Sequence, residues 1–530
     1  MMQSHKIKLA ETGYFSKVVL DYINESDALK PFVHAFPSKE NLERQLKSKI
    51  ISTSTRHTLF SSLHTDYETI AKENQVVDNI ALLAHENTFT ICTAHQPNIF
   101  TGYLYVIYKI AHTIRLANQC KEWFPNYNFV PIYFMGSEDN DIEEIGTFNL
   151  QEKKLRWQTT QTGACGEMST EDLLPLRDEL IATLNENIAF EASLIDALKI
   201  AYDGNNTLSE ATLILLNFLF GKYGLVILDA NRAALKQIFQ EVFFNEIEKQ
   251  ASFQISSQAI QNFQQHYKSQ ATPREINLFY LLKGIRERII QDGDQYKVLN
   301  TDLHFSKLEI LTEINNHPEH FSPNVMLRPL YQEMILPNIA FVGGGGELAY
   351  WLPLKSLFNN FKVNFPILIL RNSFQIITAA QTKKMAKLNL SWSRIFKQPE
   401  ENIKAELISD PFLIALSEKQ EAMHEKMQEI IALGTSISSQ LEKSMLAHQA
   451  KYQRLNKRVQ QKFKAQIKRK NQDRLNQLCE LHDGLFPNNT LQERSLNYFT
   501  MIKMLPDNFI EQIILHSENF GKEMIVLEVD

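Results

Sequence analysis

Cysteine, glycine and proline are all scarce in this chain. Its 530 residues include 4 cysteines, 18 glycines and 17 prolines. The cysteines are scattered and form no C-x-x-C pair, which argues against a zinc knuckle and against a disulfide scaffold. They are Cys92, Cys120, Cys165 and Cys479. With so few glycines and prolines, long low-complexity linkers are not expected either.

The chain also lacks a long apolar run. A membrane-spanning helix needs about 20 apolar residues, and the most apolar stretch, 211–230, is interrupted by Asn217, Lys222 and Asp229. The first ten residues are polar and lack the apolar core of a secretory signal. The sequence therefore predicts a cytoplasmic protein with reduced thiols and no membrane partner.

What is present is ordinary globular composition, with 44% hydrophobic and 22% charged residues. The formal net charge of −6 does not call for a nucleic-acid partner. At roughly 100–200 residues per domain, the length predicts more than one core.

Five apolar runs alternate with helical segments between residues 88 and 370. The predicted strands are Thr88–Thr93, Phe129–Met135, Leu225–Leu228, Ile339–Val342 and Phe365–Leu370. Continuous apolar strands separated by helices indicate an α/β protein with a mostly parallel sheet. Residues 1–85 have a helical pattern, and Met524–Val529 could add an edge strand.

A different pattern begins after about Pro411. Residues 418–478 contain no proline and one glycine, Gly434, and their apolar residues have an approximate 3-4 spacing. This predicts a long helical hairpin or coiled coil with a break near Gly434–Ser436. Residues 441–474 carry eleven Lys or Arg and two acidic residues, a local charge of +9. Because no known nucleic-acid motif accompanies them, we interpret them as a solvated helix face, and RNA binding is the alternative.

Polar motifs follow the predicted strands, where ligands of open parallel sheets bind. After the first strand come His95, Gln96, Asn98 and Thr101, with Gly102 opening a helix that carries Lys109. Such a loop suits an anion, and His95 could act as an acid or base. The alternative is a helix cap with a structural histidine.

The second predicted strand ends in Ser137, Glu138, Asp139, Asn140 and Asp141. If this segment is extended, Asp139 and Asp141 point to the same side. Such a carboxylate pair can hold Mg²⁺ or orient an ammonium group. A solvated acidic loop is the alternative.

Further candidates flank the fourth and fifth strands. Glycines 343 to 346 precede a helix that begins with Glu347 and would let a ligand approach the backbone, although the loop matches neither a Walker A nor a G-x-G-x-x-G pattern. The other candidates are Arg274, Asn277, Arg328, Gln332, Glu333, Tyr350 and Arg371. Arginine forks recognise carboxylate or phosphate, and surface ion pairs are the alternative. We also expect a helix between Asn277 and Arg286.

Taken together, these segments resemble the bacillithiol biosynthesis cysteine-adding enzyme family, BshC. The resemblance runs through TAHQPNIFTGYLYVIYKI, PIYFMGSEDNDIEEI, GLVILDA, TPREINLFYL and RPLYQEMILPNIAFVGGGGELAYW. It implies a Rossmann-like core at 1–410, a helical coiled-coil arm at 411–480 that forms a homodimer, and a segment at 481–530 that returns to the core.

The resemblance implies a ligase that joins L-cysteine to the glucosamine amine of glucosaminyl-malate through an amide bond, the last step of bacillithiol synthesis. ATP or ADP with Mg²⁺ is the candidate cofactor, and the metal ligands stay open. Asn140 stands where the family pattern has histidine. The base is therefore expected among His95, Glu138, Asp139 and Asp141.

The remaining candidates would bind the substrates. Arg274, Arg328 and Arg371 could hold the malate carboxylates, and the loops at 95–102 and 343–346 could hold a phosphate. Two other functions remain open. The HQPNIF loop resembles the WbqC-like family, which suggests a nucleotide- or sugar-phosphate transferase in surface-polysaccharide synthesis. The basic helical segment suggests a coiled-coil scaffold that binds RNA.

Overall fold

The computed structural model describes residues 2–70, 73–150, 153–270, 272–408, 410–470 and 472–529. They fall into two compact units. The first holds the described parts of Met1–Ala10, Tyr14–Ile376 and Thr490–Asp530, and the second holds Glu11–Gly13 and Ile377–Asn489.

A five-stranded parallel sheet forms the centre of the first unit. Its strands, in spatial order, are β13 (Ile367–Leu370), β12 (Asn338–Gly343), β2 (Thr88–His95), β3 (Asn128–Met135) and β6 (Val226–Asp229). The five predicted strands and the α/β class are therefore confirmed. Numbered along the chain, this order is 5-4-1-2-3, the strand order of a Rossmann-like sheet. The direction in which strands are added reverses between β2 and β12.

The sheet strands are buried along nearly their whole length, which is why their sequences are continuous apolar runs. Helix α6 (Leu104–Trp123) follows β2 and packs against β2 and β3. It has buried residues on nearly every side. One apolar cluster joins the sheet to α6 and to α3 (Lys39–Ser48). The polar loops that follow β2 and β3 therefore project from a rigid, close-packed sheet.

A second five-stranded sheet lies in the connection between β6 and β12. Its strands are β10 (His304–Ser306), β9 (Gln295–Val298), β8 (Ile285–Asp292), β7 (Leu278–Leu282) and β11 (Phe321–Pro323). The predicted helix before Arg286 is wrong, because β7 and β8 form an antiparallel hairpin there. Its two-residue turn holds Gly284 at φ +77°, a conformation that favours glycine.

The chain ends meet in a three-stranded sheet with the order β1 (Ser4–Lys8), β15 (Glu523–Val529) and β14 (Ser373–Thr378). The predicted strand near the C-terminus is therefore the middle strand of this sheet and not an edge. Apart from β1, the N-terminal segment has the predicted helical character. Its helices are α1 (Leu9–Thr12), α2 (Lys17–Ile23), α3, α4 (Thr53–Asp66) and α5 (Asn74–Leu82).

The other helices of the first unit fill the connections between its sheets. They are α7 (Ile142–Ile145), α8 (Leu174–Ile181), α9 (Ala189–Ala201), α10 (Leu208–Phe220), α11 (Ala233–Ile238), α12 (Gln240–Lys249), α13 (Ala251–Gln264), α14 (Lys307–Asn316), α15 (Arg328–Ile335), α16 (Gly345–Trp351), α17 (Lys355–Asn360), α23 (Gln492–Ser495), α24 (Tyr498–Met501) and α25 (Phe509–His516). A small hairpin of β4 (Thr147–Leu150) and β5 (Lys153–Arg156) follows α7.

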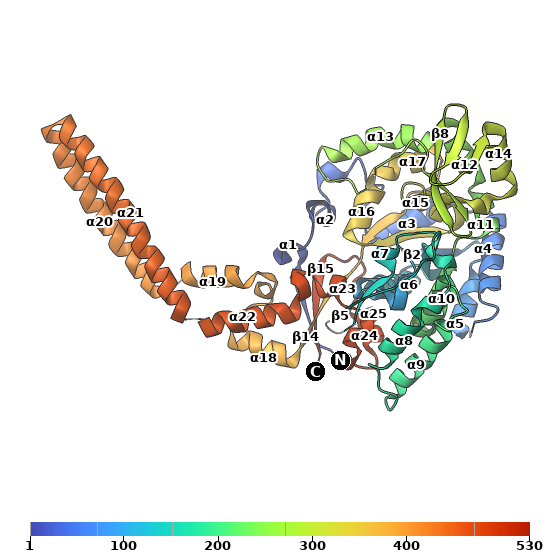
Figure 1. Cartoon of the computed structure of the whole chain (residues 1–530), viewed down its shortest axis with the longest axis horizontal. Helices are drawn as coiled ribbons and strands as arrows, with labels where there is room; N and C mark the ends of the chain where they lie inside the picture. The colour runs from blue at the N-terminus through green and yellow to red at the C-terminus, as the bar shows by residue number, and fades with distance from the viewer. Residues whose placement is uncertain are drawn as a thin grey trace. The chain divides into compact units, whose positions relative to one another are not determined.

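The second unit is helical, and its long helices α20 (Pro411–Ile437) and α21 (Ser439–Lys470) pack side by side, as Figure 1 shows. The predicted helical hairpin is confirmed, with its break at Ser438, just after the predicted position. Gly434 is buried at the contact, where an added Cβ would lie 3.2 Å from Cγ of Met445. The other helices are α18 (Ala379–Lys387), α19 (Pro399–Ile408) and α22 (Gln472–Leu485).

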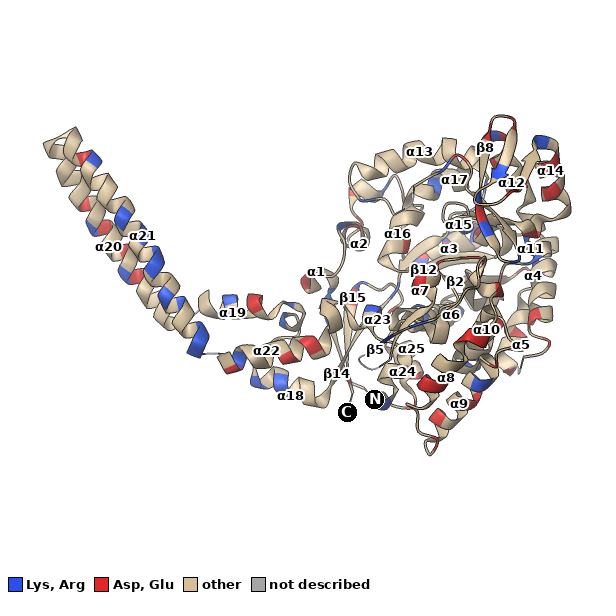
Figure 2. Ribbon diagram, in the orientation of Figure 1, with Lys and Arg blue, Asp and Glu red and all other residues tan. Residues whose placement is uncertain are grey.

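Lys and Arg residues are distributed along α21, as the blue segments of its ribbon in Figure 2 show. No described residue of α21 is buried, which agrees with a solvated helix face. Among the described residues, no helix has the length and apolarity needed to cross a membrane.

The hairpin leaves apolar side chains uncovered. Leu433 on α20 is 67% exposed and Leu455 on α21 is 57% exposed. We propose that a second copy of the chain covers them, because large apolar side chains are stabilised by removal from water. The full chain should therefore scatter light as a dimer.

Replacing Leu433 and Leu455 with Glu should shift the molar mass toward that of a monomer. Gln461→Glu on α21 introduces the same charge at an exposed polar position and should leave the dimer intact. A wild-type monomer, or an unchanged mass in the double variant, would contradict the dimer.

Candidate active site at the strand ends

A cavity of about 510 Å³ lies beyond the carboxyl ends of β2, β3 and β12. This is the expected ligand position for an open α/β sheet whose strand order reverses between β2 and β12. Its volume lies in the range of about 300–1,000 Å³ that is usual for small-molecule sites. The sequence-predicted residues that line it are His95, Gln96, Lys109, Ser137, Glu138, Asp139, Arg328, Gly344, Gly346, Glu347, Tyr350 and Arg371.

An ion pair between buried Lys109 and partly buried Glu347 joins the segments that follow β2 and β12. Nζ of Lys109 lies 2.7 Å from Oε2 of Glu347, and it also donates to the carbonyl of Ala94 at 2.5 Å. Glu347 in turn accepts from the backbone N–H of Gly344 at 2.8 Å. Burial opposes the charge of Glu347, but Lys109 outweighs it and holds the pKa of Glu347 below its usual value. The pair therefore fixes both loops at the cavity wall.

His95 ends β2 and has partners at both ring nitrogens. Nε2 lies 3.0 Å from the hydroxyl of Tyr105, and Nδ1 lies 3.1 Å from Oδ1 of Asn98. Burial, with the nearby charge of Lys109, lowers the pKa of His95 to about 4. His95 is therefore neutral near pH 7, and its Nε2 is engaged by the hydroxyl of Tyr105.

Carboxylates line part of the cavity. Gln96 donates to Oδ2 of Asp139 at 3.1 Å and to Oε2 of Glu144 at 3.4 Å. Burial, together with Asp141 and Asp139, raises the pKa of Glu144. Glu138 lies next to these carboxylates and forms an ion pair with buried Lys236. Glu144 is a functional candidate that sequence reasoning missed.

Asp141 does not share the cavity with Asp139. The segment is not extended, because Asp139 donates its N–H to the carbonyl of Gly136 in a turn. Asp141 is exposed and caps α7, accepting from the N–H of Glu144 at 3.1 Å. Its carboxylate therefore serves the helix and does not line the cavity.

Cations also line the cavity, and Arg328 at the start of α15 is the main one. Nη1 donates to Oε1 of Gln332 at 3.1 Å and Nη2 donates to the hydroxyl of Tyr350 at 2.8 Å. The guanidinium also lies 5.7 Å from the ring centre of Phe134. None of the described carboxylates forms an ion pair with it. A largely buried guanidinium without a carboxylate partner suits an anionic ligand.

Arg371 lines the cavity but is already paired. Its Nη1 and Nη2 donate to the two carboxylate oxygens of Glu493 at 2.7 and 2.6 Å, and both side chains are almost fully buried. This is the bidentate geometry that a malate carboxylate would use. The guanidinium of Arg371 is therefore already occupied by Glu493, which lies 122 positions later in the chain.

The end of the loop at 95–102, which was expected to hold a phosphate, is packed into the protein. Phe100, Thr101 and Gly102 all have positive φ, at 48°, 67° and 65°. Asn497 holds this bend by donating to the carbonyls of Phe100 and Gly102 at 2.9 and 2.6 Å. A Cβ on residue 102 would lie 2.8 Å from that of Asn98, so glycine is needed for packing. Asn98, Thr101 and Gly102 do not line the cavity.

Arg274 is exposed and Asn277 is buried in a network with Glu246, and neither lines the cavity. Arg286 takes that place because the β7–β8 hairpin directs it inward. Its Nη1 lies 3.0 Å from Oδ1 of Asn140 and 3.7 Å from Oδ1 of Asp139. A cation from this part of the chain was expected to reach the ligand. Because of the hairpin, Arg286 lines the cavity and Arg274 does not.

Two other predicted side chains lie behind the cavity wall. Glu333 is fully buried and pairs with Lys49 at 3.5 Å, and Asn338 donates to it at 2.7 Å. Gln332 orients Arg328 from behind. Gly343 ends β12 and Gly345 contacts Val19, so only Gly344 and Gly346 of the glycine loop line the cavity.

Sequence reasoning missed several lining residues. Besides Glu144 they include Tyr105, Asn231, Asn324 and Arg494. Arg494 lies in α23, far along the chain, where no strand-end signal marks it. Tyr105 lies one helical turn before Lys109, so the helical spacing of α6 could have indicated it.

The thiols are poor candidates for nucleophiles. Cys92, Cys120 and Cys165 are buried, as expected. Burial raises the pKa of Cys92 well above its usual value and that of Cys165 to about 12. These cysteines are therefore protonated near neutral pH.

A larger hollow of about 1,410 Å³ adjoins the cavity. The two share Met135, Ser137 and Asn231 in their walls. Ser137 donates to Oδ1 of Asp229 at 2.5 Å in this shared wall. The site therefore has room for more than one small molecule.

The strand order and a ligand cavity at its reversal define a Rossmann-like α/β protein with an added helical unit. The chain belongs to the BshC family of bacillithiol biosynthesis. The model of the N-terminal Rossmann-like domain of bacillithiol biosynthesis BshC matches residues 2–372. The model of the C-terminal coiled-coil domain matches residues 374–529. The family resemblance of the sequence motifs is thus confirmed over nearly the whole chain.

Relatives named "Putative cysteine ligase BshC" are similar over nearly their full length. The one from Flavobacterium johnsoniae is 41% identical over 505 residues, which cover 94% of each chain. The one from Flavobacterium psychrophilum is 39% identical, with 97% of each chain covered. A more distant relative from Chlorobaculum tepidum is 26% identical over 99% of this chain and 98% of its own.

The Lys109–Glu347 pair predicts a stability effect. Lys109→Met leaves the carboxylate of Glu347 in the wall without its cation, which should lower the free energy of unfolding by about 3 kcal/mol at pH 7. Lys199→Met, at an exposed position of α9, should change it by less than about 0.5 kcal/mol. Urea unfolding followed by circular dichroism measures both.

The effect of Lys109→Met should also depend on pH. The lowered pKa of Glu347 means that its stabilising contribution is present above its unfolded pKa and is lost as the pH falls through the folded pKa. The deficit of the variant should therefore shrink in acid. Equal stabilities of the Lys109 and Lys199 variants at pH 7 would show that the pair does not hold the loops.

Proposed function

We propose that this chain is a cysteine ligase that joins the carboxyl of L-cysteine to the glucosamine amine of glucosaminyl-malate. The observation that carries the proposal is the cavity at the strand-order reversal, whose lining holds both carboxylates and an arginine without a carboxylate partner in the described part of the chain. The name of the relatives from the same family, "Putative cysteine ligase BshC", supports it. A transferase and an RNA-binding scaffold lack a comparable observation.

The cationic lining suits the malate end of glucosaminyl-malate. Arg328 has no carboxylate partner among the described residues, and Gln332 and Tyr350 fix the direction of its fork. Arg494 also lines the cavity. Two carboxylates need at least one bidentate cation, and Arg328 is the best placed because Arg371 is held by Glu493.

The acidic lining suits the glucosamine amine. Asp139 and Glu144 are held by Gln96 and could bind the ammonium form. The amine must lose a proton before it attacks an acyl group. Glu144 is our candidate base, because its raised pKa brings it closer to neutral pH. His95, with its pKa lowered to about 4 and its nitrogens engaged, is better suited to positioning Tyr105.

Formation of an amide from a carboxylate and an amine releases water and requires an activated carboxyl group. We propose ATP with Mg²⁺ as the co-reactant that activates the cysteine carboxyl. The glycine loop is a poor phosphate cradle at Gly344, because the carboxylate of Glu347 already accepts its N–H. Gly346 is open, with no atom within 4 Å of an added Cβ. Any phosphate would therefore approach at Gly346 and near Arg494.

The ligase is tested by incubating the purified chain with glucosaminyl-malate and cysteine, with and without MgATP, and measuring bacillithiol by mass spectrometry. Bacillithiol formation that depends on the protein supports the proposal. A deletion strain should lose bacillithiol and accumulate glucosaminyl-malate. Normal thiol levels with altered surface polysaccharide would favour the transferase, and salt-sensitive RNA retention would favour the scaffold.

Arg328→Lys tests the malate end. Lysine keeps the charge but lacks the planar fork, so the affinity for glucosaminyl-malate should fall about tenfold or more, with the affinity for cysteine unchanged. Arg274→Lys, at an exposed position outside the cavity, is the matched control. Titration calorimetry measures both, and equal affinities for glucosaminyl-malate in the two variants would remove Arg328 from the site.

Asp139→Asn and Asp141→Asn form a matched pair on the acidic loop. Asp139 lines the cavity, so losing its charge should lower the affinity for the glucosamine ammonium by about tenfold to a hundredfold. Asp141 caps α7, and asparagine caps a helix equally well, so this variant should keep near-normal activity. Bacillithiol levels in a complemented deletion strain compare them. Normal bacillithiol levels with both variants would contradict the proposal that Asp139 binds the glucosamine amine.

A further inference from the structure

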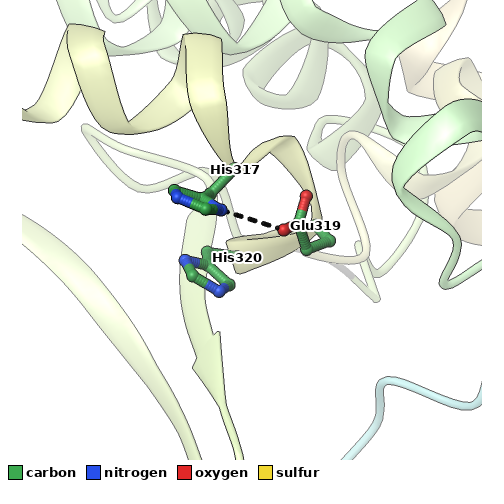
Figure 3. A group of neighbouring side chains, drawn as sticks. All are labelled: His317, Glu319 and His320. Carbon is green, nitrogen blue, oxygen red and sulfur yellow. Dashed lines mark hydrogen bonds and ion pairs between the residues drawn. The ribbon is translucent and has the colours of Figure 1, made fainter.

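A group of metal-ligand side chains lies outside the cavity, at the end of α14. Ligand atoms of His317, Glu319 and His320 lie within 4.8 Å of one another. Nδ1 of His317 is 3.1 Å from Oε1 of Glu319. The imidazole rings of His317 and His320 stack with their centres 4.9 Å apart, and Figure 3 shows Glu319 beside them.

This donor set suits zinc. Two imidazoles and one carboxylate are typical ligands of Zn²⁺, and a water molecule would complete four-coordination. At bond lengths of about 2.0–2.1 Å, the ligand atoms of a tetrahedral site lie about 3.3 Å apart. The separation of His317 and Glu319 already matches that value, so small side-chain rotations would bring the three ligands around one ion.

The neighbouring residues support one ligand in the way that metal sites usually do. His320 has its Nδ1 2.7 Å from Oε1 of Glu313, and the hydroxyl of Tyr280 donates to the same carboxylate oxygen at 2.7 Å. A carboxylate behind a histidine fixes the ring and its tautomer, which leaves Nε2 for the metal. An accidental pair of surface histidines would not need such support.

The position of the group links it to the cavity. The chain runs from His320 directly into β11 (Phe321–Pro323). The carbonyl of Phe321 accepts from Nζ of Lys236 at 2.6 Å, and Oγ of Ser322 donates to Oε2 of Glu138 at 3.3 Å. Pro323 lines the cavity. A metal at His317, Glu319 and His320 would therefore hold the segment that supports Glu138.

We propose that His317, Glu319 and His320 bind one zinc ion, which braces β11 at the wall of the cavity. The site is separate from the reacting groups and does not depend on the proposed ligase activity. Zinc can reach it, since the side chain of His317 is 51% exposed and that of His320 is 25% exposed.

The test uses the untagged full chain, stripped of metal by a chelator and then titrated with Zn²⁺ in a calorimeter. Wild type should bind one equivalent at this site, and its unfolding temperature should rise with zinc concentration. His317→Ala and His320→Ala should each weaken this binding at least tenfold. Glu313→Gln should weaken it about 10- to 100-fold through the lost support of His320.

His304→Ala is the matched control, because His304 is exposed in the same sheet but lies outside the group. It should bind zinc like wild type, as should Cys479→Ser, which tests the partly exposed thiol. Circular dichroism without zinc establishes that each variant is folded. No bound equivalent in wild type, or unchanged zinc affinity in the folded His317 variant, would overturn the proposal.

Discussion

The ion pair between Lys109 and Glu347 connects helices α6 and α16, which follow the two strands between which the site lies. Lys109 comes from the helix after β2 and Glu347 from the helix after β12, and strand order reverses between these strands. Lys109 also holds the carbonyl of Ala94, and Glu347 holds the N–H of Gly344. Because a charge in such a wall is costly without its partner, each loop depends on the other for its position.

The fixed loops bring both signs of charge into one cavity. Asp139 and Glu144 accept from Gln96, and Arg328 lines the same cavity without a carboxylate partner among the described residues. A small molecule with an amine at one end and carboxylates at the other matches this arrangement. The geometry thereby supports the chemistry that the family name suggests.

The sequence predicted the parts that local pattern controls and missed those set by distant contacts. The five apolar strands and the helical hairpin follow from short periodic patterns. Asp141 was misplaced because the period of a strand was applied to a turn, and the segment before Arg286 was taken for a helix although β7 and β8 form a hairpin there. No local signal could show that Glu493 occupies the fork of Arg371, since the partners are 122 residues apart.

A crystal structure of the chain with glucosaminyl-malate tests this role of the cavity most directly. We predict that the malate carboxylates contact Arg328 and that the glucosamine amine lies within hydrogen-bond distance of Asp139 or Glu144. A reversed orientation of the ligand, or binding outside the cavity with Arg328 left uncontacted, would contradict the account.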